Sequence, residues 1–195
     1  MRSRICLLPV LSFLVGAAVS QEPASEKRSR PALLDAIQAN LVGAWTGNLQ
    51  YRDYQTNELV TVPTWLEVKR TLEGGSLEFR YLYDDGPSKL AHEASRVTLD
   101  LEKNTFSVAS EDGKDTDVYQ LSGADGLSAA GLGTLTMTGS GVENDKKVEV
   151  RITLRLGRNE YHYLRETRLP GQAFQMRDAY NFTRRDPPLG AAPTR

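Results

Sequence analysis

Two stretches of the chain carry aromatic residues at every second position, and these side chains are the best suited to bind a small molecule. The first set is Phe79, Tyr81 and Tyr83, and the second is Tyr161, Tyr163 and Arg165. Because alternate residues of a β-strand share one face of a sheet, each set is expected to line one surface. Rings, phenol hydroxyls and a guanidinium in one interior would suit a flat or elongated amphipathic molecule with an acidic group. The alternation does not fix the inward face, so tyrosines in a packed core or in water fit the pattern equally well.

No pattern in the sequence predicts catalysis, and we expect no catalytic residues. No serine lies in the G-x-S-x-G elbow that presents the nucleophile in many hydrolases. The neighbouring carboxylates Asp84 and Asp85 precede Gly86 and are typical of a turn. Asp115 and Asp117 share one strand face, where like charges side by side favour exposure to solvent.

The sequence also predicts neither a metal site nor a bound cofactor. His92 and His162 are the two histidines, and neither has a second ligand at a spacing typical of a metal-binding pair. The chain has 24 Lys and Arg against 25 Asp and Glu, a formal charge of −1, which lacks the basic excess of nucleic-acid-binding proteins. We therefore expect a small molecule as the partner, and no nucleic acid.

Residues 1–20 are typical of a secretory signal peptide. Arg2 and Arg4 precede an apolar run that is short for a membrane span, and Ala18 and Ser20 provide small residues before a cleavage point. We expect cleavage after residue 20 and a secreted or periplasmic protein without integral membrane association; an uncleaved N-terminal anchor is the alternative. The only cysteine, Cys6, would leave with the signal, so core packing alone must hold the exported domain together.

The remaining chain is predicted to contain one helix followed by a run of strands. Residues 21–30 are polar and are expected to form a disordered linker, as are 186–195 at the C-terminal end. Pro31, Leu33, Ile37 and Leu41 have the spacing of a short helix over 31–41. About ten alternating segments follow between turn signals, and they start near residues 44, 59, 76, 89, 105, 115, 131, 147, 160 and 173.

Short connections between these segments favour antiparallel neighbours and an up-and-down order. Closure into a barrel would remove the two exposed edges of such a sheet, so we predict an all-β, antiparallel, up-and-down barrel of about 8–10 strands over 31–185. A two-sheet sandwich is the competing arrangement. Pro63 lies inside the second segment and indicates a bulge or bend there.

The first strand carries a detail that resembles a known superfamily. Gly43-Ala44-Trp45 follows the predicted helix and opens the run of strands, as the G-x-W signature does in the lipocalin and calycin superfamily. The resemblance implies that Trp45 closes one end of the barrel and packs against an arginine near the last strand, which here would be Arg184 or Arg185. The chain also looks like uncharacterised bacterial lipocalin-like exported proteins.

The resemblance has departures that limit what it implies. Secreted lipocalins usually carry a disulfide, which this mature chain lacks. Fatty-acid-binding barrels hold a carboxylate with an R-x-Y pair, whereas the spacing of Arg177 and Tyr180 predicts opposite faces. The haem-binding nitrobindins also begin G-x-W-x-G, as here with Gly47, and use a late histidine. His162 is the only late histidine and lacks the partners that tune an axial ligand, so no haem is expected.

These observations together predict an exported, lipocalin-like barrel of monomeric size that binds a small apolar or amphipathic molecule without chemical turnover. A small barrel enzyme, an isomerase or hydrolase that acts through lumenal Tyr, Asp or His, is one alternative. A structural or inhibitor module with a packed core is the other. The state of the interior, whether empty, polar-lined or packed, separates the three.

Overall fold

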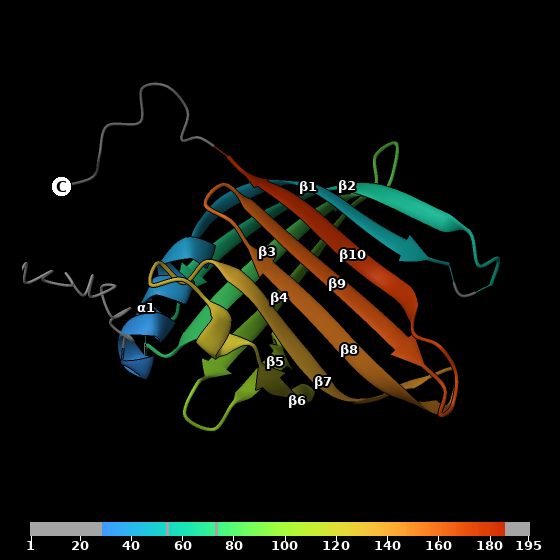
Figure 1. The fold of residues 1–195 in the computed structure, drawn as a ribbon. Helices are drawn as coiled ribbons and strands as arrows, with labels where there is room; N and C mark the ends of the chain where they lie inside the picture. The colour runs from blue at the N-terminus through green and yellow to red at the C-terminus, as the bar shows by residue number, and fades with distance from the viewer. Residues whose placement is uncertain (1–28, 54, 73, 186–195) are drawn as a thin grey trace, which may run out of the picture.

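The computed structural model describes residues 29–53, 55–72 and 74–185, which form a barrel with one helix beside it (Figure 1). The predicted signal peptide (1–20), most of the linker and the C-terminal tail (186–195) lie outside the described residues and stay predictions. No helix of the described residues is long and apolar enough to cross a membrane.

The described residues form ten antiparallel strands that close into a barrel in the order β1-β10-β9-β8-β7-β6-β5-β4-β3-β2. Each strand pairs with its sequence neighbours, and β1 closes the ring against β10. The elements are α1 (Arg30–Leu41), β1 (Gly43–Arg52), β2 (Leu59–Arg70), β3 (Ser76–Asp84), β4 (Leu90–Asp100), β5 (Thr105–Ser110), β6 (Thr116–Ser122), η1 (Ala124–Gly126), β7 (Gly133–Glu143), β8 (Lys146–Leu156), β9 (Glu160–Arg168) and β10 (Gln175–Arg184). The predicted fold class is confirmed, and the sandwich alternative is wrong.

Alternation of apolar and polar residues is what makes these segments strands with one inner face. In β8, the side chains of Val148, Val150, Ile152, Leu154 and Leu156 are all buried, while the intervening residues are more exposed. Turn residues fix the connections between strands: Asn144 and Asp145, with φ of 48° and 59°, form the two-residue connection of the β7–β8 hairpin. Such left-handed pairs match the twist of the flanking strands and set their register.

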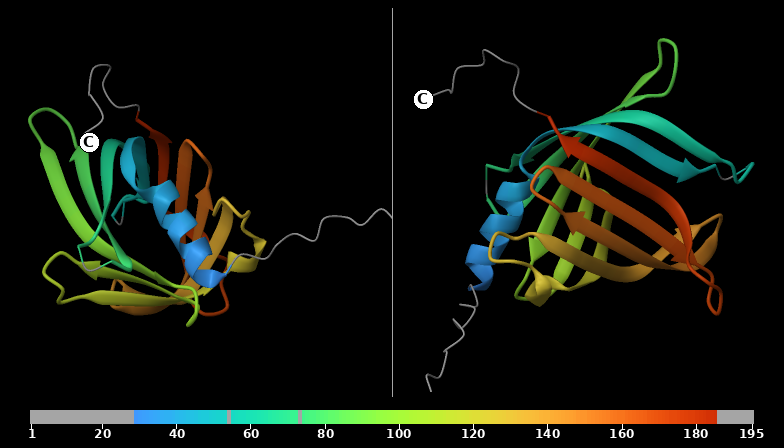
Figure 2. Two further views of the ribbon diagram at one scale, coloured as in Figure 1. Left: turned by 90° about the vertical axis from the view of Figure 1, so that its left-hand side faces the viewer. Right: turned by 45° about the horizontal axis from the view of Figure 1, so that its top comes forward.

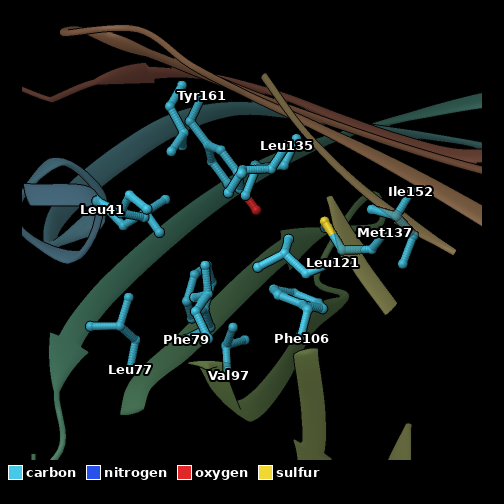
Figure 3. Close-up of a cluster of buried hydrophobic side chains, with 14 of the residues drawn as sticks. Leu41, Leu77, Phe79, Val97, Phe106, Leu121, Leu135, Met137, Ile152 and Tyr161 are labelled. Carbon is cyan, nitrogen blue, oxygen red and sulfur yellow. The ribbon is translucent and has the colours of Figure 1, made fainter. Parts of the chain in front are cut away.

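Helix α1 covers one end of the barrel, which we call the closed end (Figure 2). Its buried residues Leu33, Ile37 and Leu41 belong to the core cluster. Figure 3 shows Leu41 on the helix side of a group of apolar side chains that fills this half of the interior. Gly131 lets a loop approach the helix, since a Cβ there would lie 2.7 Å from the Ile37 nitrogen. The opposite end, which we call the open end, has no such helix among the described residues.

One irregularity in β10 reverses which of its first residues point into the barrel. The register between β10 and β9 shifts between Met176 and Asp178, which is a β-bulge at Arg177. The prediction that Arg177 and Tyr180 lie on opposite faces is therefore wrong, because both line the same interior cavity. Of the bulge or bend expected at Pro63, the bulge is not found: β2 pairs with β1 through that residue without a register shift.

Trp45, Arg184 and Gly43 form a tight junction at the closed end, where β1 meets β10. Trp45 is buried, and its indole Nε1 donates to the Leu41 carbonyl at 2.9 Å. The Arg184 guanidinium lies 4.2 Å from the Trp45 ring centroid and donates to the Val42 carbonyl at 2.9 Å. The arginine beside the tryptophan is thus Arg184.

Gly43→Ala should destabilise the protein more than Gly126→Ala. Gly43 has φ of 137°, and an added Cβ would lie 2.6 Å from Arg184 Nη1. We expect the free energy of unfolding in urea to fall by about 2 kcal/mol, from backbone strain and displacement of Arg184. Gly126→Ala is the control, since nothing lies within 4 Å of its Cβ position. Equal stability of the two variants would contradict the role of Gly43.

Candidate ligand-binding cavity

The half of the barrel interior toward the open end contains a cavity of about 420 Å³. Its apolar walls come mainly from Leu49, Val97, Phe106 and Val108. Its polar lining consists of Tyr51, Arg52, Tyr81, Glu93, Ser95, Asp117, Tyr119, Tyr163, Arg165, Arg177, Asp178 and Tyr180. The interior is therefore packed at the closed end and hollow, with many hydrogen-bonding groups, at the open end.

The predicted ligand-binding residues divide between this cavity and the core beneath it. Tyr81, Tyr163 and Arg165 line the cavity. Tyr83 lines an adjoining pocket of about 230 Å³, which shares Leu49, Tyr51, Glu93 and Tyr180 with the main cavity. Phe79 and Tyr161 are 3% and 4% exposed and belong to the packed core. Their binding role stays a prediction.

A continuous series of aromatic rings, which we call the aromatic column, connects the closed end to the open end. Consecutive ring centroids are 6.0, 5.7, 5.7, 5.3 and 5.8 Å apart along Trp45, Tyr161, Phe182, Tyr180, Tyr81 and Tyr83. Three of these contacts are nearly parallel stacks, with interplanar angles of 7°, 12° and 5°. Ring contacts of this kind fix side-chain orientation, so the upper rings have a rigid base.

The upper end of the aromatic column carries a hydrogen-bonded group of hydroxyls. Tyr83 donates to Glu93 Oε2 at 3.0 Å, and the hydroxyls of Tyr83 and Tyr180 lie 2.9 Å apart. Burial raises the pKa of Tyr81, Tyr163 and Tyr180, and it raises the pKa of Tyr119 to about 12. These phenols are therefore neutral at ordinary pH and serve as hydrogen-bond donors and acceptors.

A cluster of two guanidiniums and two carboxylates lies on the side of the barrel formed by β7 to β10, with its members on β7, β9 and β10. Arg165 lies 3.4 Å from Asp178 Oδ2 and 3.6 Å from Glu143 Oε1. Arg177 Nε lies 3.5 Å from the same Glu143 oxygen, and Thr167 donates to the other oxygen at 2.9 Å. Burial raises the pKa of Asp178, and Arg165 opposes that effect. The positive charge expected to attract an acidic ligand is already balanced by protein carboxylates.

Both histidines lie on the outer face of the barrel. His162 Nδ1 is 2.9 Å from Asn181 Oδ1, between the inward residues Tyr161 and Tyr163 in the sequence. His92 is exposed and precedes Glu93, which faces the cavity. As placed, neither imidazole reaches the cavity. Among the described residues, no group of three or more His, Cys, Asp or Glu side chains is placed to hold a metal ion.

Several cavity residues were not predicted from the sequence. Asp178 interrupts an otherwise apolar alternation in β10, and this interruption is the sequence signal that could indicate an inward-facing charge. Arg177 depends on the β-bulge, for which the sequence has no clear signal. Glu93 lies in a polar stretch of β4 without alternation, and Tyr119 is a single aromatic residue on a short strand.

The geometry defines a class: a closed, ten-stranded, up-and-down antiparallel barrel with a helix over one end and a polar-lined cavity at the other. No family model matches the sequence, and no curated protein matches it. A solved structure with a similar fold is that of Rv2717c from M. tuberculosis. The two share 19% identity with a TM-score of 0.50, over 77% of this chain and 98% of the other. That likeness shows the fold, and no family match supports the lipocalin assignment.

Glu143→Gln should destabilise the folded protein, because it leaves Arg165 and Arg177 close together with one carboxylate fewer. The side chains of Glu143 and Arg177 are 12% and 14% exposed, so solvent screens them poorly. We expect the free energy of unfolding to fall by about 2 kcal/mol, measured in urea. The control is Glu149→Gln, which breaks a more exposed pair with Arg168 and should lower stability by less than about 1 kcal/mol. Equal losses of stability in the two variants would contradict the proposed role of Glu143 in compensating Arg165 and Arg177.

The protein should unfold in base as its tyrosines ionise. Burial raises the pKa of six of the eight tyrosines. The folded state thus retains protons that the unfolded chain releases above about pH 10, so stability is complete below that pH and falls as pH rises. Phenolate absorbance should increase together with loss of the β-sheet circular dichroism signal. Tyr163→Phe should move this transition to higher pH.

Ionisation of most tyrosines in a chain that still has its sheet signal would contradict this expectation.

Proposed function

We propose that this protein is an exported binding protein that holds a small apolar or amphipathic molecule in its open-end cavity without turning it over. The observation that carries the proposal is the cavity of about 420 Å³ with a mixed aromatic and polar lining. Ligand sites of small molecules typically have volumes of about 300–1,000 Å³, apolar walls and a few oriented polar groups. The signal-like residues 1–20 and the lack of cysteine after Cys6 support export.

The lipocalin-like assignment also belongs to this proposal. It is supported by the position of Trp45 at the closed end, under the Arg184 guanidinium and next to the helix. A barrel that binds a molecule in its lumen needs one closed end and one open end. We propose a monomer, because closure of β1 against β10 satisfies the edges through which sheets associate.

β5 and β6 are the shortest strands of the barrel, so the wall extends least far there toward the open end. We propose this side as the route into the cavity. β6 pairs with β7 only from Gln120 to Ser122, whereas β7 pairs with β8 along its whole length. The last residues of β7 therefore extend beyond the β6 pairing. Asp117 and Tyr119 lie at this side of the lining and would contact a molecule that enters there.

The two alternatives receive less support from the arrangement of the interior. Lumenal catalysis would be favoured by a buried carboxylate paired with a histidine at the cavity. The half-buried Asp178 instead faces Arg165, and both histidines lie outside. A module with a packed core would be favoured by a filled lumen, and here only the closed-end half is filled.

Filling the cavity should abolish binding of a neutral fluorescent probe. Val108 lines the cavity, so Val108→Trp should weaken the affinity for N-phenyl-naphthylamine by at least about tenfold, measured by fluorescence titration. Val118→Trp adds the same indole on the outer face, where Val118 is 60% exposed, and should leave the affinity unchanged. Thermal melts of both variants check that they are folded.

Absence of probe binding to the unsubstituted protein, or equal binding by both variants, would overturn the proposed cavity function.

A further inference from the structure

The loops at the open end carry an excess of negative charge. The five loops there contain seven acidic residues and two basic ones: Asp53, Glu58, Asp85, Glu111, Asp112, Asp115 and Asp145 against Lys89 and Lys114. Both lysines are already paired with loop carboxylates, Lys89 with Asp85 and Lys114 with Asp112. The four loops that connect strands at the closed end contain three acidic and two basic residues. The negative charge is therefore concentrated around the mouth of the cavity.

Two carboxylates continue this charge into the cavity. Glu93 and Asp117 both line it, and both are exposed within the structure. Glu93 accepts a hydrogen bond from the Tyr83 hydroxyl, a neutral group. Neither carboxylate has an ion-pair partner among the described residues. Glu93 and Asp117 thus have tyrosine partners and no cationic partner among the described residues, and a cationic ligand group could supply one.

The arginines of the cavity do not offer an equivalent site to an anion. Arg165 is balanced by Asp178 and Glu143, and Arg177 lies against Glu143 as well. The third arginine that lines the cavity is Arg52, which lies at the rim and donates to the Asn57 carbonyl. An anionic ligand would have to displace an existing carboxylate or stay at the rim. Desolvation of a second negative charge beside Asp178 would oppose its binding.

Aromatic faces complete the arrangement. The Tyr180 ring contacts two other rings, with centroid distances of 5.3 Å to Tyr81 and 5.8 Å to Tyr163. All three rings line the cavity. Phe106 and Tyr119 contact each other across the lining at 6.3 Å. The negative face of an aromatic ring attracts a cation, and the attraction strengthens where water is excluded.

We propose that the ligand of this cavity is a small organic cation: a protonated amine or quaternary ammonium attached to an apolar or aromatic group. The cationic group lies against the tyrosine rings beside Glu93, which pairs with Tyr81 across β3 and β4. Asp117 adds negative charge at a second place in the lining, and the apolar group lies against Phe106 and Val108. The acidic loops raise the local concentration of such a molecule at the mouth and speed its association. This inference rests on the proposed function and adds the sign of the ligand charge.

The test compares three probes of similar shape that differ in charge: phenethylamine, phenethyl alcohol and phenylacetate. Binding is followed by chemical-shift changes of the backbone amides of the isotope-labelled protein. We expect the amine to bind at least about tenfold more tightly than the alcohol, and phenylacetate to bind more weakly than the alcohol. Added salt should weaken amine binding and leave alcohol binding unchanged.

A charge-neutral double variant identifies the responsible residues. Glu93→Gln with Asp117→Asn keeps side-chain size and leaves an amide oxygen that can accept from Tyr83. It should reduce amine affinity to that of the alcohol without changing the affinity for the alcohol. Glu102→Gln, in a closed-end loop, is the matched control and should change neither.

The outcomes separate this inference from the proposed function. Equal affinity for the three probes, or tightest binding of phenylacetate, would overturn the cationic ligand while the cavity remains a binding site. Failure of all three probes while N-phenyl-naphthylamine binds would also overturn it. Failure of that neutral probe as well would overturn the proposed function itself.

Discussion

The pairing of β1 with β10 is the interaction on which the rest of the structure depends. It joins the first and last strands of the described chain through seven residue pairs, from Trp45 with Arg184 to Tyr51 with Asp178. Without it the sheet would have two free edges and no interior. The same seam is fixed at the closed end by the Trp45–Arg184 contact, and near the open end it leads directly into the bulge at Arg177. Closure and the shape of the cavity are thus set along one strand pair.

The interior changes from apolar to polar along the barrel axis, and the change follows the cost of burying polar groups. Beneath the helix, where water is excluded, the inward residues are aliphatic or aromatic. Toward the mouth, Arg165, Asp178 and Glu143 face inward but remain 12–24% exposed and are paired. A charge that keeps some contact with water and has a partner loses far less free energy than an isolated buried one. The aromatic column spans both regions because a tyrosine has an apolar ring and a polar tip.

Most of the fold could be predicted from the sequence, because strand alternation and turn residues are local signals. Helix 31–41 and the ten strand starts follow from them, and all six predicted binding residues lie on inward faces. The depth of each residue along the axis was not predictable, so Phe79 and Tyr161 fall in the packed core. Alternation alone predicts the wrong face for Arg177, because one extra residue in β10 inverts the alternation before it. Glu93 lies in a strand segment without a hydrophobic pattern.

The pairing of the buried arginines also bears on what the cavity can select. Arg165, taken alone, would indicate an anionic ligand. Inside a barrel, however, a guanidinium requires carboxylates to compensate its desolvation, and Asp178 and Glu143 supply them. The side-chain charges that can attract a ligand are then those without an ion-pair partner in the protein. In this cavity Arg52 lies at the rim, and the negative remainder is carried by Glu93 on β4 and Asp117 on β6, beneath acidic loops. We therefore infer that a cavity whose two inner arginines are already paired favours a positive ligand.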